Sequence, residues 1–567
     1  MASPALTQPS YSSSMADKPL LGMTIGDKFD QIATQYADND ALIVLHQNIH
    51  WSYRQLQEEV NRCARALLSI GVNKGDRVAI WAPNCSEWTL TQFATAKIGA
   101  ILVNINPSYR THELEYALNQ SGARFLVTAN NFKSSDYSAM LYELAPELKA
   151  SNDGELKSQK LPDLECIINL SSEKLSGMWR WSDLMKEANK VSQTDVDDLQ
   201  ATLQFDDAIN IQYTSGTTGF PKGATLSHHN ILNNGFFVAE SMGFTSEDRL
   251  VIPVPLYHCF GMVMGNLGCM THGATMIYPD EGFDPGKVLK AVHDQKATAL
   301  YGVPTMFIAE LEHEGFASTD FSTLRTGIMA GSICPAEIMK QVINKMNMKG
   351  VQIAYGMTET SPVSTQTGAN DSIEKRVSTV GRTQPHLENK IVDPGNGGIL
   401  PRGEIGELCT RGYSVMLKYW NNDKATAEAI DEAGWMHTGD LATMDEEGYI
   451  QIVGRIKDMV IRGGENVYPK EIEEFLYAHP AISEVQVTGV PDKKYGEELI
   501  AWVKLNSTAG DVTGEELREY CKGKITHFKI PRYFKFVDEF PMTVTGKIQK
   551  FKMREISIQE LGLDQES

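Results

Sequence analysis

Residues 213–223 read Tyr-Thr-Ser-Gly-Thr-Thr-Gly-Phe-Pro-Lys-Gly, and this run constrains the fold and chemistry of the chain more than any other. Its three glycines let backbone amides approach a polyanion, four of its hydroxyl groups can donate to phosphate oxygens, and Lys222 adds a positive charge. We therefore expect a phosphate-binding loop, with a surface turn after a strand as the alternative. A P-loop NTPase is disfavoured, because a Walker A loop needs a second glycine five residues after the first, and Pro221 stands five residues after Gly216.

The length and charge of the chain limit its organisation and its partners. With 567 residues it is too long for one hydrophobic core and predicts several structural units. Apolar residues make up 42% and charged residues 22%, which is ordinary for a soluble globular protein. The net charge of -20 and the isoelectric point near 5.2 argue against nucleic acid or an anionic membrane as a partner.

The cysteines and the apolar segments predict a cytoplasmic protein without a transmembrane segment. None of the eight cysteines forms a Cys-x-x-Cys pair, so the spacing indicates neither a zinc site nor a disulfide framework. Residues 1–20 lack the apolar centre of a signal peptide and the arginines of a transit peptide, and we expect a disordered tail there. The most apolar segment, 251–270, is interrupted by Pro253, Pro255 and Asn266, which predicts a buried strand and helix.

Short apolar runs alternate with helical patterns over much of the chain, which predicts βαβ units and largely parallel sheets. The strand at 208–213 leads into the Thr/Gly loop, and the helix at 227–242 follows it. From 380 to 455, short strand-like runs between turn residues predict an antiparallel or barrel-like section. A separate α+β unit begins after residue 455. Further predicted segments are strands at 77–81, 101–104 and 124–127 and helices at 86–98, 112–120 and 470–478.

Seven segments, in order along the chain, resemble the motifs of the adenylate-forming superfamily, which contains acyl-CoA synthetases, luciferases and adenylation domains. The resemblance covers the chain from about residue 25 to residue 554. The segments 461–469 and 527–550 look most like the medium-chain fatty acyl-CoA ligase branch. The seven motifs are the run at 213–223, Trp-Ser-Tyr-Arg-Gln-Leu at 51–56, Ala-Lys-Ile-Gly-Ala at 96–100, Tyr-Gly-Met-Thr-Glu-Thr at 355–360, Trp-Met-His-Thr-Gly-Asp at 435–440, Gly-Arg-Ile-Lys-Asp at 454–458 and Pro-Met-Thr-Val-Thr-Gly-Lys at 541–547.

The resemblance implies an α/β fold with two domains. A large N-terminal AMP-binding adenylation domain, residues 21–455, would combine βαβ-type sheets with the barrel-like section. A small mobile α+β domain would follow at residues 456–567. The resemblance also implies that ATP, Mg²⁺ and coenzyme A take part in the reaction.

The resemblance assigns an ATP site. Adenylation is an attack by one anion on the phosphorus of another, so positioning and charge neutralisation must dominate catalysis. Thr358 would contact the α-phosphate, Glu359 would bind magnesium, and Lys547 would bridge the substrate carboxylate and the α-phosphate. The implied ATP-binding residues are Thr214, Ser215, Gly216, Thr217, Thr218, Gly219, Phe220, Pro221, Lys222, Gly331, Ser332, Tyr355, Gly356, Asp440, Arg455 and Lys547; the implied catalytic residues are Lys547, Thr358, Glu359, His258 and Lys222.

The nucleoside would be held by residues from several motifs. By resemblance, Asp440 accepts hydrogen bonds from both ribose hydroxyls and Arg455 adds a cationic donor. The turn at 331–332 and the pair at 355–356 would form the adenine slot. Without the resemblance, Asp440 would be a helix N-cap or turn aspartate and Arg455 a surface ion-pair partner, and a glutamate in such a turn is more often a solvated loop residue than a ligand.

The C-terminal segment would carry the coenzyme A site. By resemblance, Gly463 and Gly464 let the pantetheine arm pass beside the backbone, and Lys529 contacts a phosphate. Residues 518–554 hold ten Lys or Arg against three acidic residues, which CoA phosphates and a solvated helix face explain equally well. Lys457 stands at the family's hinge position, so the small domain would rotate between two half-reactions.

Acyl recognition is assigned to the segment after residue 256. No charged residue lies between 253 and 270, which favours an alkyl chain, since an ammonium group would need a buried counter-charge. His258 resembles the family's aromatic gate beside the carboxylate. Three glycines, Gly261, Gly265 and Gly268, are candidates for facing the acyl chain. The predicted acyl-pocket residues are Tyr257, His258, Phe260, Val263 and Met264.

The leading prediction is an enzyme that activates a medium- to long-chain fatty acid to acyl-CoA through an acyl-adenylate, releasing AMP and pyrophosphate. One alternative transfers the acyl group to a carrier-protein thiol, and another is a nucleotide-binding scaffold without catalysis. The scaffold is disfavoured because every charged residue that the resemblance requires is present. The substrates are small molecules, with no nucleic acid; chain length and oligomeric state, a homodimer included, are left open by the sequence.

Overall fold

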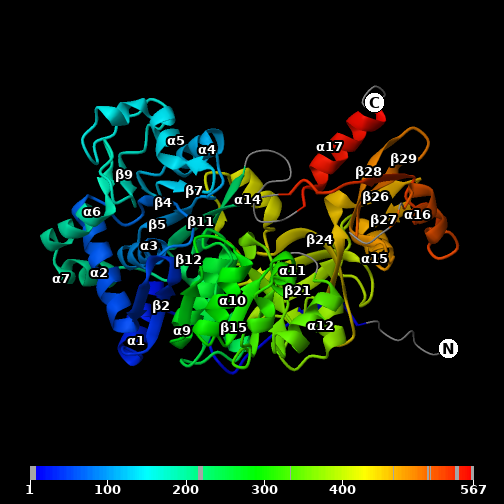
Figure 1. Cartoon of the computed structure of the whole chain (residues 1–567), viewed down its shortest axis with the longest axis horizontal. Coiled ribbons are helices and arrows are strands. Elements are labelled where there is room, and N and C mark those ends of the chain that lie inside the picture. The colour runs from blue at the N-terminus through cyan, green and yellow to red at the C-terminus, as the bar shows by residue number, and fades with distance from the viewer. Residues whose placement is uncertain are drawn as a thin grey trace. The chain divides into compact units, whose positions relative to one another are not determined.

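The structure is a computed structural model that describes residues 8–214, 221–331, 334–463, 465–506, 510, 512–542 and 548–563. The chain divides into two compact units (Figure 1). The large unit comprises Ser12–Asn389 and Thr410–Met436, and the small unit comprises Met1–Tyr11, Lys390–Cys409 and His437–Ser567. The chain therefore passes between the two units four times, whereas domains that follow one another along a sequence need one passage.

The first sheet of the large unit is mainly parallel. Its strands follow the order β10-β9-β6-β4-β5-β11-β12-β23. Neighbouring strands from β10 to β11 are parallel, whereas β12 and β23 are each antiparallel to the strand before. The bounds are β10 (Trp179–Arg180), β9 (Cys166–Asn169), β6 (Phe125–Thr128), β4 (Arg77–Trp81), β5 (Ile101–Asn104), β11 (Ala208–Thr214), β12 (Lys222–Ser227) and β23 (Lys418–Tyr419).

The helices beside this sheet confirm the predicted alternation of strands and helices. Helix α3 (Ser86–Ile98) lies where the sequence places it, and α4 (Thr111–Ser121) is one residue longer at each end. Helix α2 (Tyr53–Ser69) begins with a capping box in which Ser52 and Gln55 bind each other's backbone amides. Its buried residues, such as Leu56 and Val60, recur at helical spacing and face the core.

The second sheet of the large unit has the order β17-β16-β15-β13-β14-β2-β3. Its strands are parallel except β3, which is antiparallel to β2. Helices α10 (Pro285–Asp294), α11 (Pro304–Glu312) and α12 (Ala336–Lys345) accompany it, in green in Figure 1. The strand bounds are β17 (Gly350–Gln352), β16 (Thr326–Met329), β15 (Ala299–Gly302), β13 (Arg249–Val251), β14 (Thr275–Tyr278), β2 (Asp40–Val44) and β3 (Ile49–Ser52).

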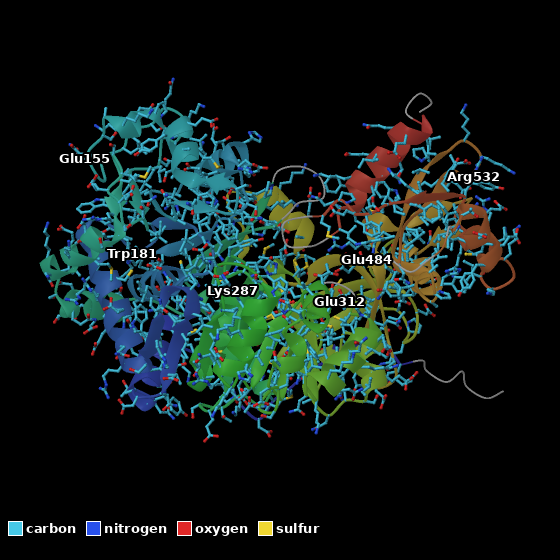
Figure 2. All side chains as sticks on the ribbon, in the orientation of Figure 1. Glu155, Trp181, Lys287, Glu312, Glu484 and Arg532 are labelled. Atoms are coloured by element: carbon cyan, nitrogen blue, oxygen red, sulfur yellow. The ribbon has the colours of Figure 1, made fainter. Side chains whose placement is uncertain are left out.

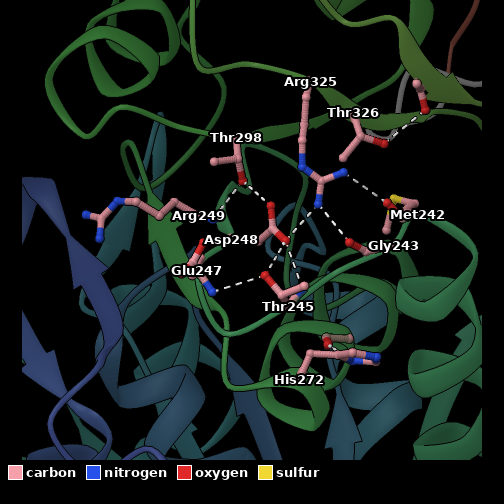
Figure 3. Close-up of polar contacts among 12 residues, drawn as sticks. Met242, Gly243, Thr245, Glu247, Asp248, Arg249, His272, Thr298, Arg325 and Thr326 are labelled. Carbon is pink, nitrogen blue, oxygen red and sulfur yellow. Dashed lines mark hydrogen bonds and ion pairs between the residues drawn. The ribbon is translucent and has the colours of Figure 1, made fainter.

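A buried carboxylate ties this sheet to helix α8 (His228–Ser241), as Figure 3 shows. Asp248 precedes β13 and accepts hydrogen bonds from Thr298 Oγ1 at 2.6 Å and Thr245 N at 2.8 Å. Arg325 pairs with the same carboxylate at 2.7 Å and also donates to Gly243 O, just after the end of α8, at 2.8 Å. The buried charge is tolerated because it is fully paired.

The apolar segment 251–270 is buried, as predicted. It contains the end of β13, the π-helix η4 (Phe260–Leu267) and the start of α9 (Gly268–His272). Every residue of η4 is buried. Charged side chains such as those of Glu155 and Lys287 lie at the surface instead (Figure 2). None of the helices in the described ranges combines the length and apolar character that crossing a membrane requires.

The section from 380 to 455 lacks the parallel βα pattern, as expected. Its strands form the sheet β1-β21-β22-β24-β25, in which β24 and β25 are antiparallel. A second sheet, β27-β26-β29-β28 with β30 beside β29, belongs to the predicted α+β unit. Its core contains Val460, Val467, Leu476 and Leu499. The bounds are β1 (Tyr11–Ser13), β21 (Leu387–Val392), β22 (Gly406–Gly412), β24 (Met436–Met444), β25 (Ile450–Arg455), β26 (Val460–Arg462), β27 (Glu465–Val467), β28 (Ile482–Asp492), β29 (Gly496–Leu505), β30 (Tyr533–Phe536), α15 (Pro469–Tyr477), α16 (Gly514–Cys521) and α17 (Lys550–Leu561).

Part of the segment 1–20, for which the composition suggests a disordered tail, is a strand, while residues 1–7 lie outside the described residues. Tyr11–Ser13 form the edge strand β1. Ser10 N donates to Leu400 O at 2.8 Å, and Ile391 N donates to Ser10 O at 2.9 Å. Composition missed this pairing because main-chain hydrogen bonds along a sheet edge require no particular side chains.

Candidate active site

Both ends of the Thr/Gly loop are fixed in the first sheet. Thr214 ends β11 opposite Lys222, the first residue of β12, and Thr214 Oγ1 donates to Lys222 O at 3.4 Å. Helix α4 holds the same ends: Tyr116 Oη donates to Pro221 O at 3.0 Å and Tyr213 Oη donates to Gln120 Oε1 at 2.6 Å. A cavity of about 460 Å³ lies along this face of α4. Loop residues 215–220 lie outside the described residues.

A buried cluster brings together two of the predicted catalytic residues. Glu359 lies in the 3₁₀ helix η6 (Thr358–Thr360) and is only 5% exposed. Tyr419 Oη donates to Glu359 Oε1 at 2.7 Å, and Lys222 Nζ lies 4.9 Å from the centroid of the Tyr419 ring. Burial, with the nearby Glu359 charge, raises the pKa of Tyr419 well above its usual range, so the phenol stays a donor. Tyr419 thus links the carboxylate to the lysine.

The turn that carries Thr358 and Glu359 is held at both ends. Before it, β18 (Ala354–Gly356) pairs with β19 (Val363–Gln366), and a Cβ on Gly356 would lie 1.8 Å from Pro362 O. Only glycine fits there. The main chain of Glu359 accepts from Met416 N at 2.9 Å. The position of Glu359 is therefore set by the local pairing of β18 with β19 and by one distant segment, which contains Met416 and Tyr419.

The two predicted parts of the adenine slot lie on different strands or turns: Tyr355 on β18 and Gly331 just after β16. Tyr355 is half-buried in β18, opposite Thr365. Gly331 follows β16 with a φ of 96°, in the region that favours glycine. Its predicted neighbour Ser332 lies outside the described residues.

The predicted acyl-pocket residues share one segment of the large unit. Phe260, Val263 and Met264 lie in the π-helix η4, a rare element that is frequent at functional sites. His258 Nδ1 accepts from Phe260 N at 3.2 Å, which leaves Nε2 to carry the proton of the neutral ring. The Tyr257 ring stands at a right angle to it, with centroids 6.4 Å apart, and burial raises the pKa of Tyr257.

The three glycines of this segment serve close packing. A Cβ on Gly261 would lie 2.4 Å from Pro255 O, and one on Gly265 would lie 3.0 Å from Ile252 Cδ1. At Gly268 the nearest atom, Gly235 O, is 3.4 Å away. None of them faces open space, so the expectation that one faces the acyl chain has no support from the packing. Gly261 lets η4 approach the main chain of Pro255, Gly265 lets it approach the Ile252 side chain, and Gly268, in α9, makes ordinary van der Waals contacts.

In the small unit, Asp440 and Arg455 stand opposite each other on β24 and β25. Arg455 Nε donates to Asp440 Oδ1 at 3.1 Å. The Arg455 side chain is 56% exposed and that of Asp440 only 13%. The strand register therefore pairs two residues that the sequence assigned separately to the ribose.

The other predicted residues of the small unit lie in turns. Lys457 is exposed in the 3₁₀ turn η7 (Ile456–Asp458), and Gly463 has a φ of 62° between β26 and β27. Lys529 forms an ion pair with Glu471 at a cavity of about 260 Å³. Gly464 and Lys547 lie outside the described residues. On either side of the undescribed residues 543–547, Gln549 N donates to Pro541 O at 2.8 Å.

Two sequence families match this chain in order. The pattern of the AMP-binding enzyme family matches residues 29–420, and that of the AMP-binding enzyme C-terminal domain matches residues 471–547. The chain belongs to the AMP-binding enzyme family.

Known relatives of this AMP-binding enzyme match it over nearly its whole length. The Bacillus subtilis protein YngI is 53% identical over 544 residues, which is 96% of this chain and 99% of YngI. The mitochondrial medium-chain acyl-CoA ligase ACSF2 of Danio rerio is 45% identical over 562 residues, 99% of this chain and 92% of its own. Among solved structures, ATP-bound MatB from Rhodopseudomonas palustris is 29% identical with a TM-score of 0.81 and covers 95% of this chain and 100% of MatB.

The residues around Glu359 are suited to a magnesium ion. A buried carboxylate offers the hard oxygen ligand that Mg²⁺ prefers, so Glu359 would hold the ion, which would supply charge neutralisation at the phosphates. Tyr419 orients this carboxylate through one oxygen. The AMP-binding enzyme thus has a preformed acidic group beside the lysine that begins β12.

Sequence reasoning missed the residues that hold the site in place. Tyr419 stands far along the chain from Glu359 and Lys222, and Tyr116 and Gln120 belong to a helix that no motif marks. The only local signal for Tyr419 is its position in a short aromatic run with Trp420. These residues act through contacts between segments that are distant in sequence.

Proposed function

We propose that this AMP-binding enzyme ligates a medium- to long-chain fatty acid to coenzyme A. The carboxylate attacks the α-phosphorus of ATP to form an acyl-adenylate and pyrophosphate, and the CoA thiol then displaces AMP. The observation that carries the proposal is the buried cluster of Glu359, Tyr419 and Lys222 at the ends of the Thr/Gly loop. The similarity to ACSF2 over 99% of the chain supports the reaction.

In the first half-reaction, the large unit neutralises the triphosphate. The loop from Thr214 to Lys222 holds the β- and γ-phosphates, and Thr358 donates to the α-phosphate. Glu359 holds Mg²⁺, which supplies charge neutralisation between phosphate oxygens when it is bound. Tyr419 keeps the Glu359 carboxylate in one orientation. The MatB structure is described as ATP-bound, which supports the use of ATP.

The small unit supplies the ribose contacts and the catalytic lysine of the proposal. Asp440 accepts hydrogen bonds from both ribose hydroxyls, and Arg455 Nε donates to Oδ1 of the same carboxylate. Arg455, whose side chain is 56% exposed, adds a cationic donor to the ribose or a phosphate. Lys547 stabilises the charge that develops between the carboxylate and the α-phosphate.

In the second half-reaction, residues of the small unit bind coenzyme A and guide its thiol. Gly463 and Gly464 admit the pantetheine arm, and Lys529 contacts a CoA phosphate. Lys457 changes its backbone angles between the two half-reactions. The 3₁₀ turn at Lys457 links β25, which carries Arg455, to β26, which leads to Gly463. This position between the two sets of residues supports the hinge.

The acyl chain is assigned to the uncharged segment around η4, with His258 beside the carboxylate. The relative ACSF2 is named as a medium-chain ligase, which supports a medium-chain acid. We propose the cytoplasm as the compartment, because all eight cysteines are buried and none of them forms a disulfide. Transfer to a carrier-protein thiol is the less favoured alternative, and the oligomeric state stays open.

The decisive experiment separates the two half-reactions. Lys547→Ala is expected to lower acyl-adenylate formation by about 10²-fold, on the scale of losing a charge-stabilising donor. Thioester formation from supplied acyl-adenylate should persist, with pyrophosphate release and acyl-CoA as the two readouts. Lys552→Ala, at an exposed lysine on α17, is the matched control. Equal loss in both half-reactions would refute the assignment of Lys547.

Substrate choice is tested by a panel of acids from acetate to palmitate. Pyrophosphate release should peak among the medium-chain acids. Free CoA should act as the acceptor in preference to a holo carrier protein. Faster turnover with the carrier protein would favour the alternative acceptor.

A further inference from the structure

Three side chains with metal-ligating atoms meet in the small unit, outside the residues assigned to ATP, CoA or the acyl chain. Glu407 and Cys409 are two residues apart on β22 and so face the same side of the sheet. His437 lies on β24, the neighbouring strand. The carboxylate oxygen, the thiol sulfur and the ring nitrogen all lie within 4.8 Å of one another.

The distances are suitable for ligands of one zinc ion. Cys409 Sγ lies 3.5 Å from His437 Nδ1, and Glu407 Oε2 lies 2.8 Å from the same nitrogen. A sulfur at about 2.3 Å and a nitrogen at about 2.0 Å from a tetrahedral zinc ion lie about 3.5 Å apart. The Glu407 contact is a hydrogen bond that a metal ion would lengthen slightly.

The chemistry of the three groups selects the ion. A thiolate and an imidazole favour Zn²⁺ and disfavour Mg²⁺, which prefers oxygen ligands. Thiolate and carboxylate together carry two negative charges and balance a divalent ion. Binding would release the protons that the thiol and the Nδ1–Glu407 hydrogen bond hold.

The exposure of the cluster leaves a path for the ion. Cys409 is buried, the Glu407 side chain is 12% exposed and the His437 side chain is 33% exposed. The ion would enter on the His437 side, and water would fill its fourth position. Three protein ligands and one open position form a common zinc arrangement.

We propose that Glu407, Cys409 and His437 form a Zn²⁺ site whose occupancy acts on the nucleotide-binding strand. Glu407 Oε1 accepts a hydrogen bond from Gly439 N at 3.1 Å, and Asp440 is the next residue. Coordination through Glu407 holds this part of β24 in one position. The coupling between zinc binding and nucleotide binding rests on the proposed ribose role of Asp440, whereas zinc binding itself does not.

Metal binding to the full chain tests the site directly. Protein stripped with a chelator and dialysed against micromolar Zn²⁺ should retain about one ion per chain in the presence of millimolar Mg²⁺. Co²⁺ should give a thiolate charge-transfer band in the near ultraviolet. Cys409→Ser should lose the band and the retained zinc, and His437→Gln should weaken binding at least about tenfold.

The control is Cys521→Ser, a buried cysteine on α16 of the same unit, which should keep both signals. If Cys409→Ser fails to fold, Glu407→Gln replaces it as the test variant. Glu407→Gln preserves the size of the side chain and should also weaken zinc binding. Absence of retained zinc in the wild-type chain, or an unchanged cobalt band in folded Cys409→Ser, would overturn the site.

The coupling has its own readout. Zn²⁺ should change the AMP dissociation constant of the wild-type chain several-fold and leave that of Cys409→Ser unchanged. By linkage, AMP should change the zinc affinity by the same factor. Equal AMP affinity with and without zinc would overturn the coupling. If Asp440→Ala leaves AMP binding intact, the proposed ribose role fails while the zinc result stands.

Discussion

In the large unit Glu359 is buried and held by several contacts, whereas in the small unit Arg455 and Lys457 are exposed. Glu359 is 5% exposed and bound by Tyr419, and its turn is fixed by Met416. Arg455 and Lys457 are exposed instead, on or beside the 3₁₀ turn η7. This contrast predicts that Glu359 is positioned before substrate binds, and that the effect of Arg455 and Lys457 depends on the proposed movement of the small unit. Four predictions test this contrast.

The largest effect is expected at the buried carboxylate. Glu359→Gln keeps the size of the side chain and removes the charge, so acyl-adenylate formation should fall by about 10²- to 10³-fold. Excess Mg²⁺ should not restore the rate. Pyrophosphate release measures it, and Glu312→Gln, at an exposed residue of α11, is the control. Activity within about threefold of wild type would break the contrast between buried and exposed sites.

The second prediction concerns acid stability of the large unit. Burial lowers the pKa of His228 from 6.5 to about 4, and His228 Nδ1 accepts from Ile25 N at 3.1 Å. Between pH 6.5 and pH 4, His228 is protonated in the unfolded chain but not in the folded chain. The contribution of neutral His228 to the unfolding free energy is therefore fully present above pH 6.5 and is lost as the pH falls to 4. The loss is about 3 kcal/mol. Urea unfolding at both pH values measures it.

The histidine test has matched variants. His228→Asn keeps an acceptor for the Ile25 amide and should make the unfolding free energy less dependent on pH over this range. His112→Gln, at an exposed histidine, should leave the slope unchanged. A wild-type slope equal to that of His228→Asn would contradict the prediction.

The third prediction concerns the hinge. Lys457→Pro fixes φ near about -65° and removes one amide, so a rotation about this residue becomes unavailable. Acyl-adenylate should still form, while acyl-CoA release falls at least about tenfold. Circular dichroism checks the fold. Normal steady-state turnover by a folded variant would exclude Lys457 as the hinge.

The smallest effect is expected at Lys529. Its ion pair with Glu471 is partly exposed and contributes about 0 to 1 kcal/mol, so Lys529→Ala should change the melting temperature little. The KM for CoA should rise several-fold, with adenylate formation unchanged. Lys522→Ala, at an exposed lysine just after α16, is the control. An unchanged KM would remove Lys529 from the CoA site.

The sequence predicted elements better than it predicted contacts. The strand at 77–81 and the helix at 86–98 match β4 and α3, because each has a strong local pattern. The link from Tyr419 to Glu359 could not be predicted, since it depends on β23 pairing with β12. The cluster of Glu407, Cys409 and His437 was missed for the same reason: its members lie on neighbouring strands, whereas spacing rules detect ligands within one loop.

The sequence by itself determined the family, the alternation of strands and helices, and the identity of the residues that the motifs mark. Local periodicity and motif order are properties of the chain, so they need no knowledge of what packs where. The tertiary structure alone decided that Tyr419 holds Glu359, that Gly261 serves packing and that Tyr11–Ser13 form a strand. These facts depend on contacts between distant segments, which sheet order and close packing fix and which no local pattern records.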